Sequence, residues 1–565
     1  MAPRYPINGV NYRPAADKER HLASGAWLDM TAGDALRSAA AALPDKAAVI
    51  AEDGTCTFGE LDALSESLAA SLLQAGLRPG DCDAFQIGAV KEIFVALYGC
   101  FKAGILPLCT LPQYREIEIG SLGERAGATA YFVQGDVAAN FDQIAFARRM
   151  LQKLPAIKHL IVTRAAAQDA LDMEAMSKAF DVRTARDIVH PHDPSPDDAI
   201  MFQLSGGSTG LPKIIPRMHA EYLGSALALM NGYQVEENDI GMWALPLIHN
   251  AGMLFMVIPT TVQRRTTVVL SGFDVETFLT TISTHRVTFT GSIGPVAPRV
   301  MEFGRIEEYD LSSLRQFFTL SRADALEAHT GIVSSNMFGI TEGLLMVSAP
   351  SDPQDARHRG IGRPTAAGDE IRLLKLGSED DAAFGDIGEL AFRGPSSLSG
   401  YFNDPKANET AFTSDGFFRT GDLLRAFKVD GVTNYVFEGR IKDNINRGGE
   451  KIGAEELENL ITAHPDVLDA RVVAMPDKIY GEKVCAYVVP KPGKAAPSVK
   501  ELGEFLLKAG IAKYKLPERI ESITAIPVTR VGKVDKVAMR ADVARKLAEE
   551  DASPDQAGVK ASRPA

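Results

Sequence analysis

The amino-acid sequence predicts an α/β fold with a large N-terminal domain and a small C-terminal one. Apolar, β-branched runs such as residues 46–52, 158–164 and 266–272 alternate with helical patterns such as residues 58–76 and 91–104. This alternation is typical of parallel strands that are covered by helices. The chain has 565 residues, of which 45% are hydrophobic, so it can bury a large core and exceeds one typical domain.

The pattern changes after about residue 386. Residues 385–403 and 416–440 read as short strands separated by glycine turns, which favours an antiparallel or β-barrel-like subdomain. A helical pattern at residues 451–465 is then followed by strand patterns at 467–477 and 483–491.

These patterns predict three parts. We expect an N-terminal domain of stacked α/β sheets plus the barrel-like subdomain over residues 1–439. A small α+β C-terminal domain follows over residues 440–545. Residues 546–565 are polar and contain proline, and we expect them to form a disordered tail.

Charge and cysteine usage narrow the classes of function. The chain carries 60 Lys and Arg against 73 Asp and Glu, which argues against a dedicated nucleic-acid binder. Its five cysteines show neither CxxC spacing nor histidine-rich surroundings, so neither a metal site nor a disulfide framework is expected. The N-terminus has no apolar signal core, and no run of about 18 apolar residues occurs. We therefore expect a cytoplasmic protein without a membrane or nucleic-acid partner.

The stretch LSGGSTGLPK (residues 204–213) has the composition of a phosphate-binding loop. A Walker-A loop needs GxxxxGK followed by Ser or Thr, because the lysine opens a helix and the hydroxyl binds magnesium. Here Pro212 disfavours a helix, and Ile214 follows the lysine. We interpret the loop as a flexible clamp whose N–H and hydroxyl groups wrap the β and γ phosphates of a nucleotide; a plain surface turn is the alternative. Its residues are Ser205, Gly206, Gly207, Ser208, Thr209, Gly210 and Lys213.

Four further motifs follow this loop in order. They are FGITEG (338–343), RTGDL (419–423), GRIKDNINRGGEKI (439–452) and VTRVGKVDK (528–536). With these motifs the chain resembles the acyl-adenylate-forming superfamily over nearly its whole length. Within it, the chain is most similar to 2,3-dihydroxybenzoate-AMP ligases and to aryl-CoA ligases close to them. The resemblance implies that ATP converts a carboxylic acid to acyl-AMP and pyrophosphate, and that a thiol then takes the acyl group.

The resemblance also assigns roles to residues of these motifs. Lys533 matches the catalytic lysine that bridges carboxylate and α-phosphate oxygens. Glu342 matches an acid that helps to hold Mg²⁺, and Thr341 would contact the α-phosphate. Asp422 would accept hydrogen bonds from both ribose hydroxyls, with Arg440 reinforcing that grip. Outside the resemblance, Lys533 would read as an exposed loop lysine and Asp422 as a turn residue. The implied ATP and AMP site joins the loop residues above with Asn336, Phe338, Gly339, Thr341, Asp422, Arg440 and Lys533.

The adenine slot is where the sequence departs from the pattern. Relatives commonly carry Gly-Gly-Ala where this chain has Ser321, Arg322 and Ala323. The adenine contacts are therefore the least defined part of the implied nucleotide site.

The resemblance further implies a mobile C-terminal domain that uses one face for adenylation and another for thioester formation. Lys442 occupies the hinge position, where a few residues near an element boundary absorb the rotation. Arg447, Gly448 and Gly449 would line the tunnel for the thiol arm, because glycines allow close approach of the backbone. A simple glycine turn is the alternative.

The segment LPLIHNAGM matches the acyl pocket of aryl-acid ligases. His249, which the resemblance also counts as catalytic, and Asn250 border the carboxylate and the ring; a satisfied core histidine is the alternative. Ala251 and Phe255 stand where dihydroxybenzoate ligases generally have a bulky aromatic residue and a serine. An apolar side chain does not pair a ring hydroxyl, so 2,3-dihydroxybenzoate itself is disfavoured. An aryl, arylalkanoic or alicyclic acid stays open, and Gly339 completes the implied pocket.

Three functions fit these features of the sequence. The leading one is an AMP-forming acid–CoA ligase for an aromatic or cyclic acid, with Mg²⁺ as cofactor and ATP and CoA as substrates. The first alternative loads the phosphopantetheine arm of a carrier protein, because the same arm enters in either case. The second is a non-catalytic homologue that only binds nucleotide, and the retained Lys533, Glu342, Asp422 and Lys442 speak against it. We expect a monomer or a homodimer.

Overall fold

The computed structural model describes residues 2–205, 212–292, 296–443, 445–447, 450–477, 480–509, 511, 513–529 and 534–552. The chain divides into two compact units. The first comprises Met1–Arg372, Ala391–Thr420 and Ala426–Val436, and the second comprises Leu373–Leu390, Gly421–Arg425 and Phe437–Ala565. The domain boundary near residue 440 stays a prediction.

One sheet of the described chain has nine strands in the order β16-β15-β14-β13-β12-β10-β11-β1-β2. The strands from β14 to β1 run parallel, and the outer strands pair antiparallel. The bounds are β1 Ala47–Ala51, β2 Gly54–Thr57, β10 Ile240–Trp243, β11 Thr266–Val269, β12 Phe289–Ser292, β13 Gln316–Thr319, β14 Ser334–Gly339, β15 Leu345–Val347 and β16 Arg363–Pro364. Apolar side chains of β10, β11 and β13 pack with those of neighbouring helices in one buried cluster.

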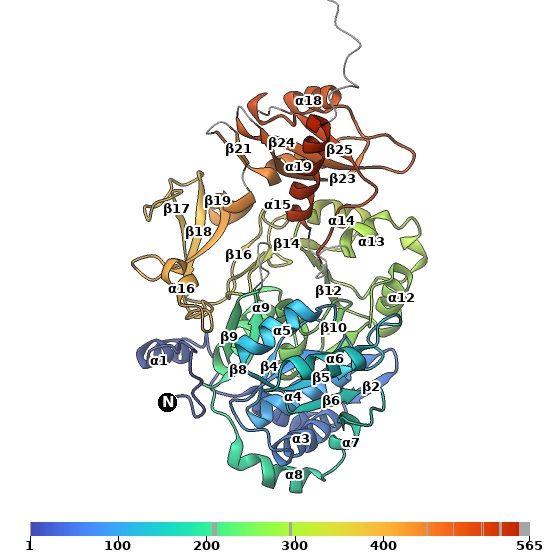
Figure 1. The fold of residues 1–565 in the computed structure, drawn as a ribbon, viewed down its shortest axis with the longest axis vertical. Helices are drawn as coiled ribbons and strands as arrows, with labels where there is room; N and C mark the ends of the chain where they lie inside the picture. The colour runs from blue at the N-terminus through green and yellow to red at the C-terminus, as the bar shows by residue number, and fades with distance from the viewer. Residues whose placement is uncertain are drawn as a thin grey trace, which may run out of the picture. The chain divides into compact units, whose positions relative to one another are not determined.

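A second sheet has the order β7-β6-β5-β3-β4-β8-β9. Its inner pairs are parallel, and β8 and β9 form an antiparallel hairpin. Figure 1 shows helices α5 and α6 beside strand β5 of this sheet. The bounds are β3 Cys82–Gln86, β4 Leu106–Leu108, β5 Ala128–Gln134, β6 His159–Thr163, β7 Leu171–Asp172, β8 Ala199–Leu204 and β9 Ile214–Met218. The parallel α/β architecture predicted from the sequence is thereby confirmed.

Two smaller sheets lie later in the chain. One has the order β17-β18-β19-β20, with bounds Glu370–Leu374, Ile387–Arg393, Phe418–Val429 and Val432–Arg440. The other has the order β22-β21-β24-β23, with β25 beside β24, and its bounds are β21 Ile445–Arg447, β22 Glu450–Ile452, β23 Val467–Asp477, β24 Gly481–Pro490 and β25 Arg519–Ser522. The predicted strand 467–477 matches β23 at both ends.

Helices connect these strands, and several begin at capping residues that the sequence supplies. Thr57 caps α3 in a reciprocal pair with Glu60, and Ser498 caps α18 with Glu501. In the first unit the helices are α1 Ala15–Ala23, α2 Ala32–Ala42, α3 Phe58–Gln74, α4 Glu92–Ala103, α5 Glu116–Ala126, α6 Gln143–Lys153, α7 Met173–Met176, α8 Val182–Val189, α9 His219–Gly232, α10 Asn250–Gly252, α11 Ile258–Val262, α12 Val275–His285, α13 Val296–Glu302, α14 Ala323–Thr330, α15 Gln354–Arg359 and α16 Pro405–Ala411. In the second unit they are α17 Ala454–Thr462, α18 Val499–Lys508 and α19 Lys536–Ala552.

Helix α19 corrects part of the prediction that residues 546–565 form a disordered tail. Residues 546–552 were expected to be disordered but continue this helix, and residues 553–565 lie outside the described residues. Lys546 and Glu550 each reach an ion-pair partner on β25, namely Glu521 and Arg519. These ion pairs, together with the helical sequence pattern, stabilise the last turns of α19.

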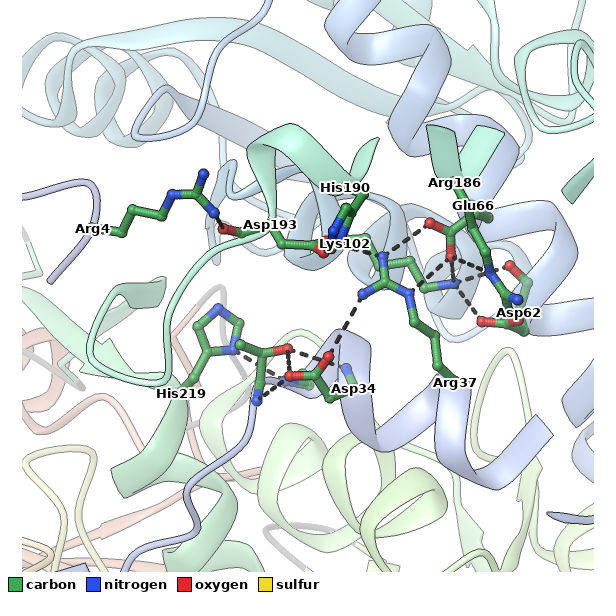
Figure 2. Close-up of polar contacts among 12 residues, drawn as sticks. Arg4, Asp34, Arg37, Asp62, Glu66, Lys102, Arg186, His190, Asp193 and His219 are labelled. Carbon is green, nitrogen blue, oxygen red and sulfur yellow. Dashed lines mark hydrogen bonds and ion pairs between the residues drawn. The ribbon is translucent and has the colours of Figure 1, made fainter. Parts of the chain in front are cut away.

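A buried ion network ties four helices of the first unit together. Lys102 of α4 is fully buried and lies 2.6 Å from Asp62 Oδ1 and 2.9 Å from Glu66 Oε2, both on α3. Arg37 of α2 pairs with Glu66, and Arg186 of α8 pairs with Asp62 (Figure 2). Because each buried charge has a partner, the network avoids the cost of an unpaired charge in the interior.

Among the described residues, no helix is both long and apolar enough to cross a membrane.

Candidate active site

The glycine-rich loop is the connection of the β8–β9 hairpin. Its residues 206–211, which include the predicted Gly206, Gly207, Ser208, Thr209 and Gly210, lie outside the described residues. Its two ends are joined, because Ser205 N donates to Lys213 O at 2.9 Å and Lys213 N donates to Ser205 Oγ at 3.0 Å. The loop leads into strand β9 and not into a helix, as Pro212 and Ile214 predict.

The FGITEG motif forms the tight turn between β14 and β15. Gly339 pairs with Leu345 across the two strands, and Gly343 N donates to Ile340 O at 3.1 Å. Gly343 has φ +132°, and a Cβ there would lie 1.7 Å from the Ser396 carbonyl oxygen. Only glycine allows the turn to press so closely on the segment at Ser396.

Glu342, the predicted magnesium ligand, lies in this turn and is held at two points. Leu398 N donates to its carbonyl oxygen at 2.9 Å, and the Tyr401 hydroxyl donates to its Oε1 at 2.9 Å. Burial, together with the Glu342 charge, raises the pKa of Tyr401 above its usual range, so the phenol stays a donor at neutral pH. Lys213 Nζ lies 4.2 Å from the centre of the Tyr401 ring. One tyrosine therefore joins the stem of the glycine loop to the acid of the turn.

Arg217 of β9 supports the neighbouring Thr341 and was not singled out from the sequence. Its Nη1 donates to Thr341 O at 2.8 Å, and its Nε donates to Glu221 Oε2 at 3.1 Å. The side chain is buried. The available signal was an arginine inside the apolar strand IIPRM with an acid four residues later, because a buried charge needs such a partner.

Asn336 holds the segment Ser321–Ala323, in which the sequence departs from the relatives. Its Oδ1 accepts a hydrogen bond from Ala323 N at 3.0 Å, and its Nδ2 donates to His358 O at 2.5 Å. The preceding residue, Arg322, has a left-handed backbone with φ +61°. The oxygen and the nitrogen of the Asn336 amide thus both bond to backbone groups. An adenine contact of Asn336 or of the buried Phe338 stays a prediction.

The predicted acyl-pocket pair lies at the start of α10. His249 caps this short helix, with its Nδ1 accepting from Ala251 N at 3.3 Å. Asn250 is buried, and its Oδ1 accepts from the Tyr222 hydroxyl at 2.8 Å. The Asn250 carbonyl oxygen is thus engaged within the protein, and a contact of its amide nitrogen with an acid stays a prediction.

Phe255 lies in a π-helical turn, η2 (Met253–Val257), and is 1% exposed. Its ring stacks on Phe318 with centroids 4.2 Å apart and on Trp243 at 5.8 Å. A Cβ on Gly291 would lie 1.8 Å from the Phe318 ring, so glycine makes room for this stack. Phe255 thus belongs to a packed aromatic wall. Its contact with an acid stays a prediction.

The second unit holds the predicted ribose and hinge residues. Arg440 Nε lies 2.9 Å from Asp422 Oδ1, and the Asp422 side chain is buried, so this pair is brought together as expected. Lys442 lies in the 3-10 turn η4 (Ile441–Asp443), and nothing is described of its side chain. Arg447 pairs with Glu518 at 2.7 Å.

Three predicted residues of the second unit, Lys533, Gly448 and Gly449, lie outside the described residues. Val528 and Val534, which lie on either side of Lys533 in the sequence, pair in an antiparallel bridge.

The chain is similar to known proteins over nearly its whole length. The model of the AMP-binding enzyme family matches residues 36–402, and the model of its C-terminal domain matches residues 456–533. The chain is 35% identical to 2,3-dihydroxybenzoate-AMP ligase of Bacillus subtilis over 96% of this chain and 99% of that one. It is 34% identical to a salicylyl-CoA synthase / salicylate adenylyltransferase of Streptomyces, over 95% of this chain and 98% of that one.

A solved structure gives the same result. The apo structure of MbtA from Mycobacterium smegmatis superposes with a TM-score of 0.71 at 32% identity, covering 94% of this chain and 98% of that one. The motif order, the turn that holds Glu342 and these matches lead to one conclusion: the chain belongs to the AMP-binding enzyme family.

Proposed function

We propose that the protein activates an aromatic or cyclic carboxylic acid with ATP and transfers the acyl group to CoA. The observation that carries the proposal is the contact chain from Lys213 through Tyr401 to Glu342. It joins the stem of the phosphate loop to the carboxylate of the FGITEG turn. Such a junction suits adenylation, because pyrophosphate leaves while negative charge spreads over the phosphates.

The residues present fit a magnesium ion. Glu342 supplies a carboxylate oxygen, and Mg²⁺ is commonly held by one or two carboxylates together with substrate phosphates. When bound, the ion would neutralise charge on the phosphate oxygens. The residues of this chain perform the other tasks: the glycine-loop stem positions the phosphates, Asp422 with Arg440 binds the ribose, and Asn250 orients the acid.

The reaction then has two steps. A carboxylate oxygen of the acid bonds to the α-phosphorus, the bond from that phosphorus to its bridging oxygen breaks, and pyrophosphate leaves. Next, the sulfur of the thiol bonds to the acyl carbon, the carbon–oxygen bond to AMP breaks, and the thiol proton passes to solvent. Lys533 is proposed to bridge the reacting oxygens in the first step only.

A carrier-protein acceptor is the second candidate. The relatives that are named AMP ligases favour it, because their names mention the adenylate and no transfer to CoA. A screen of pyrophosphate release with aryl, arylacetic and alicyclic acids, with and without CoA, distinguishes the two. Acyl-CoA formation supports the proposal, turnover only with a carrier protein reverses the preference, and release with none of the acids contradicts acid activation.

Replacing Lys533 with Ala tests its assigned role. We expect K533A to lose acid-dependent ATP–pyrophosphate exchange, because the transition-state charge then lacks its cation. Thioester formation from preformed acyl-AMP should survive. Wild-type exchange in K533A would refute the assignment.

A further inference from the structure

We propose that the N-terminal arm, residues 2–31, positions Glu342 and that Arg13 is its main contact. The proposal rests on the proposed function, in which Glu342 serves the MgATP complex. The family model matches only from residue 36, so the arm lies outside that match. Its effect passes through a second segment, residues 394–403, which we call the strap.

The arm is first anchored to residues outside the strap. Arg4 Nη1 donates to Asp193 O at 2.8 Å, and its Nη2 donates to Pro191 O at 2.9 Å. Tyr5 N donates to Asp198 Oδ1 at 2.7 Å. These bonds fix the beginning of the arm to the segment before β8.

The arm then binds the backbone of the strap. Arg13 Nη2 donates to both Gly394 O, at 2.9 Å, and Ser397 O. Trp27, which is 5% exposed, donates from Nε1 to Pro395 O at 2.9 Å. Three backbone carbonyls of the strap, at Gly394, Pro395 and Ser397, thus accept hydrogen bonds from two side chains of the arm. Gly394 O keeps a second donor, Ser397 N at 3.3 Å, whereas a buried carbonyl that loses its donor is left unsatisfied.

Close packing shows that the arm and the strap fit at both ends. A Cβ on Gly400 of the strap would lie 2.3 Å from Asn11 Nδ2. A Cβ on Gly9 of the arm would lie 2.0 Å from Asn403 Oδ1. Between them lies a cavity of about 20 Å³, lined by Arg13 among others, which has room for about one water molecule. The two segments therefore form one packed layer.

The strap in turn holds the proposed site. Leu398 N donates to Glu342 O, Tyr401 donates to Glu342 Oε1, and the Ser396 carbonyl contacts the Gly343 backbone. Displacing the strap would therefore move both contacts of Glu342 at once. Arg13 acts through the strap and does not touch the reacting atoms, so it is a positioning residue.

A second route leads from Arg13 to the same turn. Arg13 lines the small cavity together with Glu221. Glu221 pairs with Arg217, whose Nη1 holds the Thr341 carbonyl. Removing Arg13 would take a cation from the surroundings of this buried pair. Thr341 and Glu342 would therefore both depend on Arg13.

The test compares Arg13→Met with Arg4→Met in the full-length protein. Both variants remove an arm arginine that donates two hydrogen bonds to loop carbonyls, but only Arg13 touches the strap. We expect R13M to raise the KM for MgATP by about tenfold, because two carbonyls lose a charged donor. The KM for the acid should change little, R4M should behave as wild type, and R13K should recover most of the loss.

Hydrogen exchange provides a readout that needs no turnover. The amides of residues 396–402 should exchange faster in R13M and in W27F than in R4M, since the strap opens locally. Faster exchange without a change in the KM for MgATP would overturn the positioning role. Unchanged exchange in both R13M and W27F would overturn the arm–strap contact itself. If no acid is activated even by the wild type, the proposed function fails, while hydrogen exchange still decides the arm–strap contact.

Discussion

The hydroxyl group of Tyr401 holds the carboxylate of Glu342 in the proposed site. It donates to Glu342 Oε1 at 2.9 Å, and its ring lies beneath Lys213 Nζ. We expect Tyr401→Phe to lower the rate of acid-dependent pyrophosphate exchange by about tenfold or more, because a hydrogen bond to a charged group contributes about 1.5–3 kcal/mol. The ring and its contact with Lys213 remain, so the variant isolates the hydroxyl. An unchanged exchange rate would show that Glu342 does not need this donor.

At the residue scale, the sequence could supply identities and chain positions but few contacts. Asp422 and Arg440 were expected to lie together, and the structure pairs them. Arg217 and Tyr222 were not singled out, because their contacts with the site residues Thr341 and Asn250 span 124 and 28 residues of the chain. Such contacts depend on the completed fold, which a local pattern does not encode.

Helices α2, α3, α4 and α8 depend on the network around Lys102. We expect Lys102→Met to lower the free energy of unfolding by about 3–5 kcal/mol, because it leaves the buried carboxylates of Asp62 and Glu66 with one cation fewer. Arg186→Met is the matched control: that arginine is half-exposed, with a side chain 48% accessible, so we expect a loss of about 1 kcal/mol or less. Denaturant unfolding measures both. Equal losses in the two variants would contradict the role of burial.

The same network makes stability depend on pH. Burial alone would raise the pKa of Glu66, but the charges of Lys102 and Arg37 outweigh it and hold the pKa below its usual value. The folded state therefore binds this proton less tightly than the unfolded state does. The contribution is present above the unfolded pKa and is lost as the pH falls through the folded pKa. In Glu66→Gln the acid-induced loss of stability should shrink, and an unchanged pH profile of unfolding would refute this assignment.

At the element scale, the strands and helices that the sequence predicted are those whose signals are local. Alternating apolar runs gave β1, β6, β11 and β23, and the capping pairs mark where helices begin. The π-helical turn at Phe255 was not predictable, because an i→i+5 ladder has no residue pattern of its own. The placement of Phe255 against Phe318 follows from that turn and from the space left by Gly291.

For the whole molecule, the proposed two-step reaction requires a change at the hinge. Lys442 lies in the η4 turn, at the end of β20. We expect Lys442→Pro to slow thioester formation from preformed acyl-AMP by more than tenfold, because proline fixes φ near the position that must rotate. Acid-dependent pyrophosphate exchange should continue. Equal effects on both half-reactions would contradict a hinge at Lys442, and Lys442→Ala serves as the control for loss of the side chain.

The order of motifs along the chain made the family predictable, while the way the sheets assemble was not. Strands β1 and β2 join β10–β16 in one sheet, although every strand of the seven-stranded sheet comes between them in the sequence. Long-range pairing of this kind depends on contacts between distant segments. The sequence alone could predict parallel strands but not which sheet each one enters.

That strand order has a consequence for synthesis on the ribosome. Val49 of β1 pairs with Thr267 of β11, so β1 emerges long before its partner exists. At about 5–20 residues per second, the gap lasts on the order of 10–40 seconds. During that time the hairpin of β1 and β2 presents an unpaired edge, which is the kind of surface that chaperones shield. A nascent chain stalled before Thr266 should therefore be captured by such factors, and one stalled well after Val269 should be released.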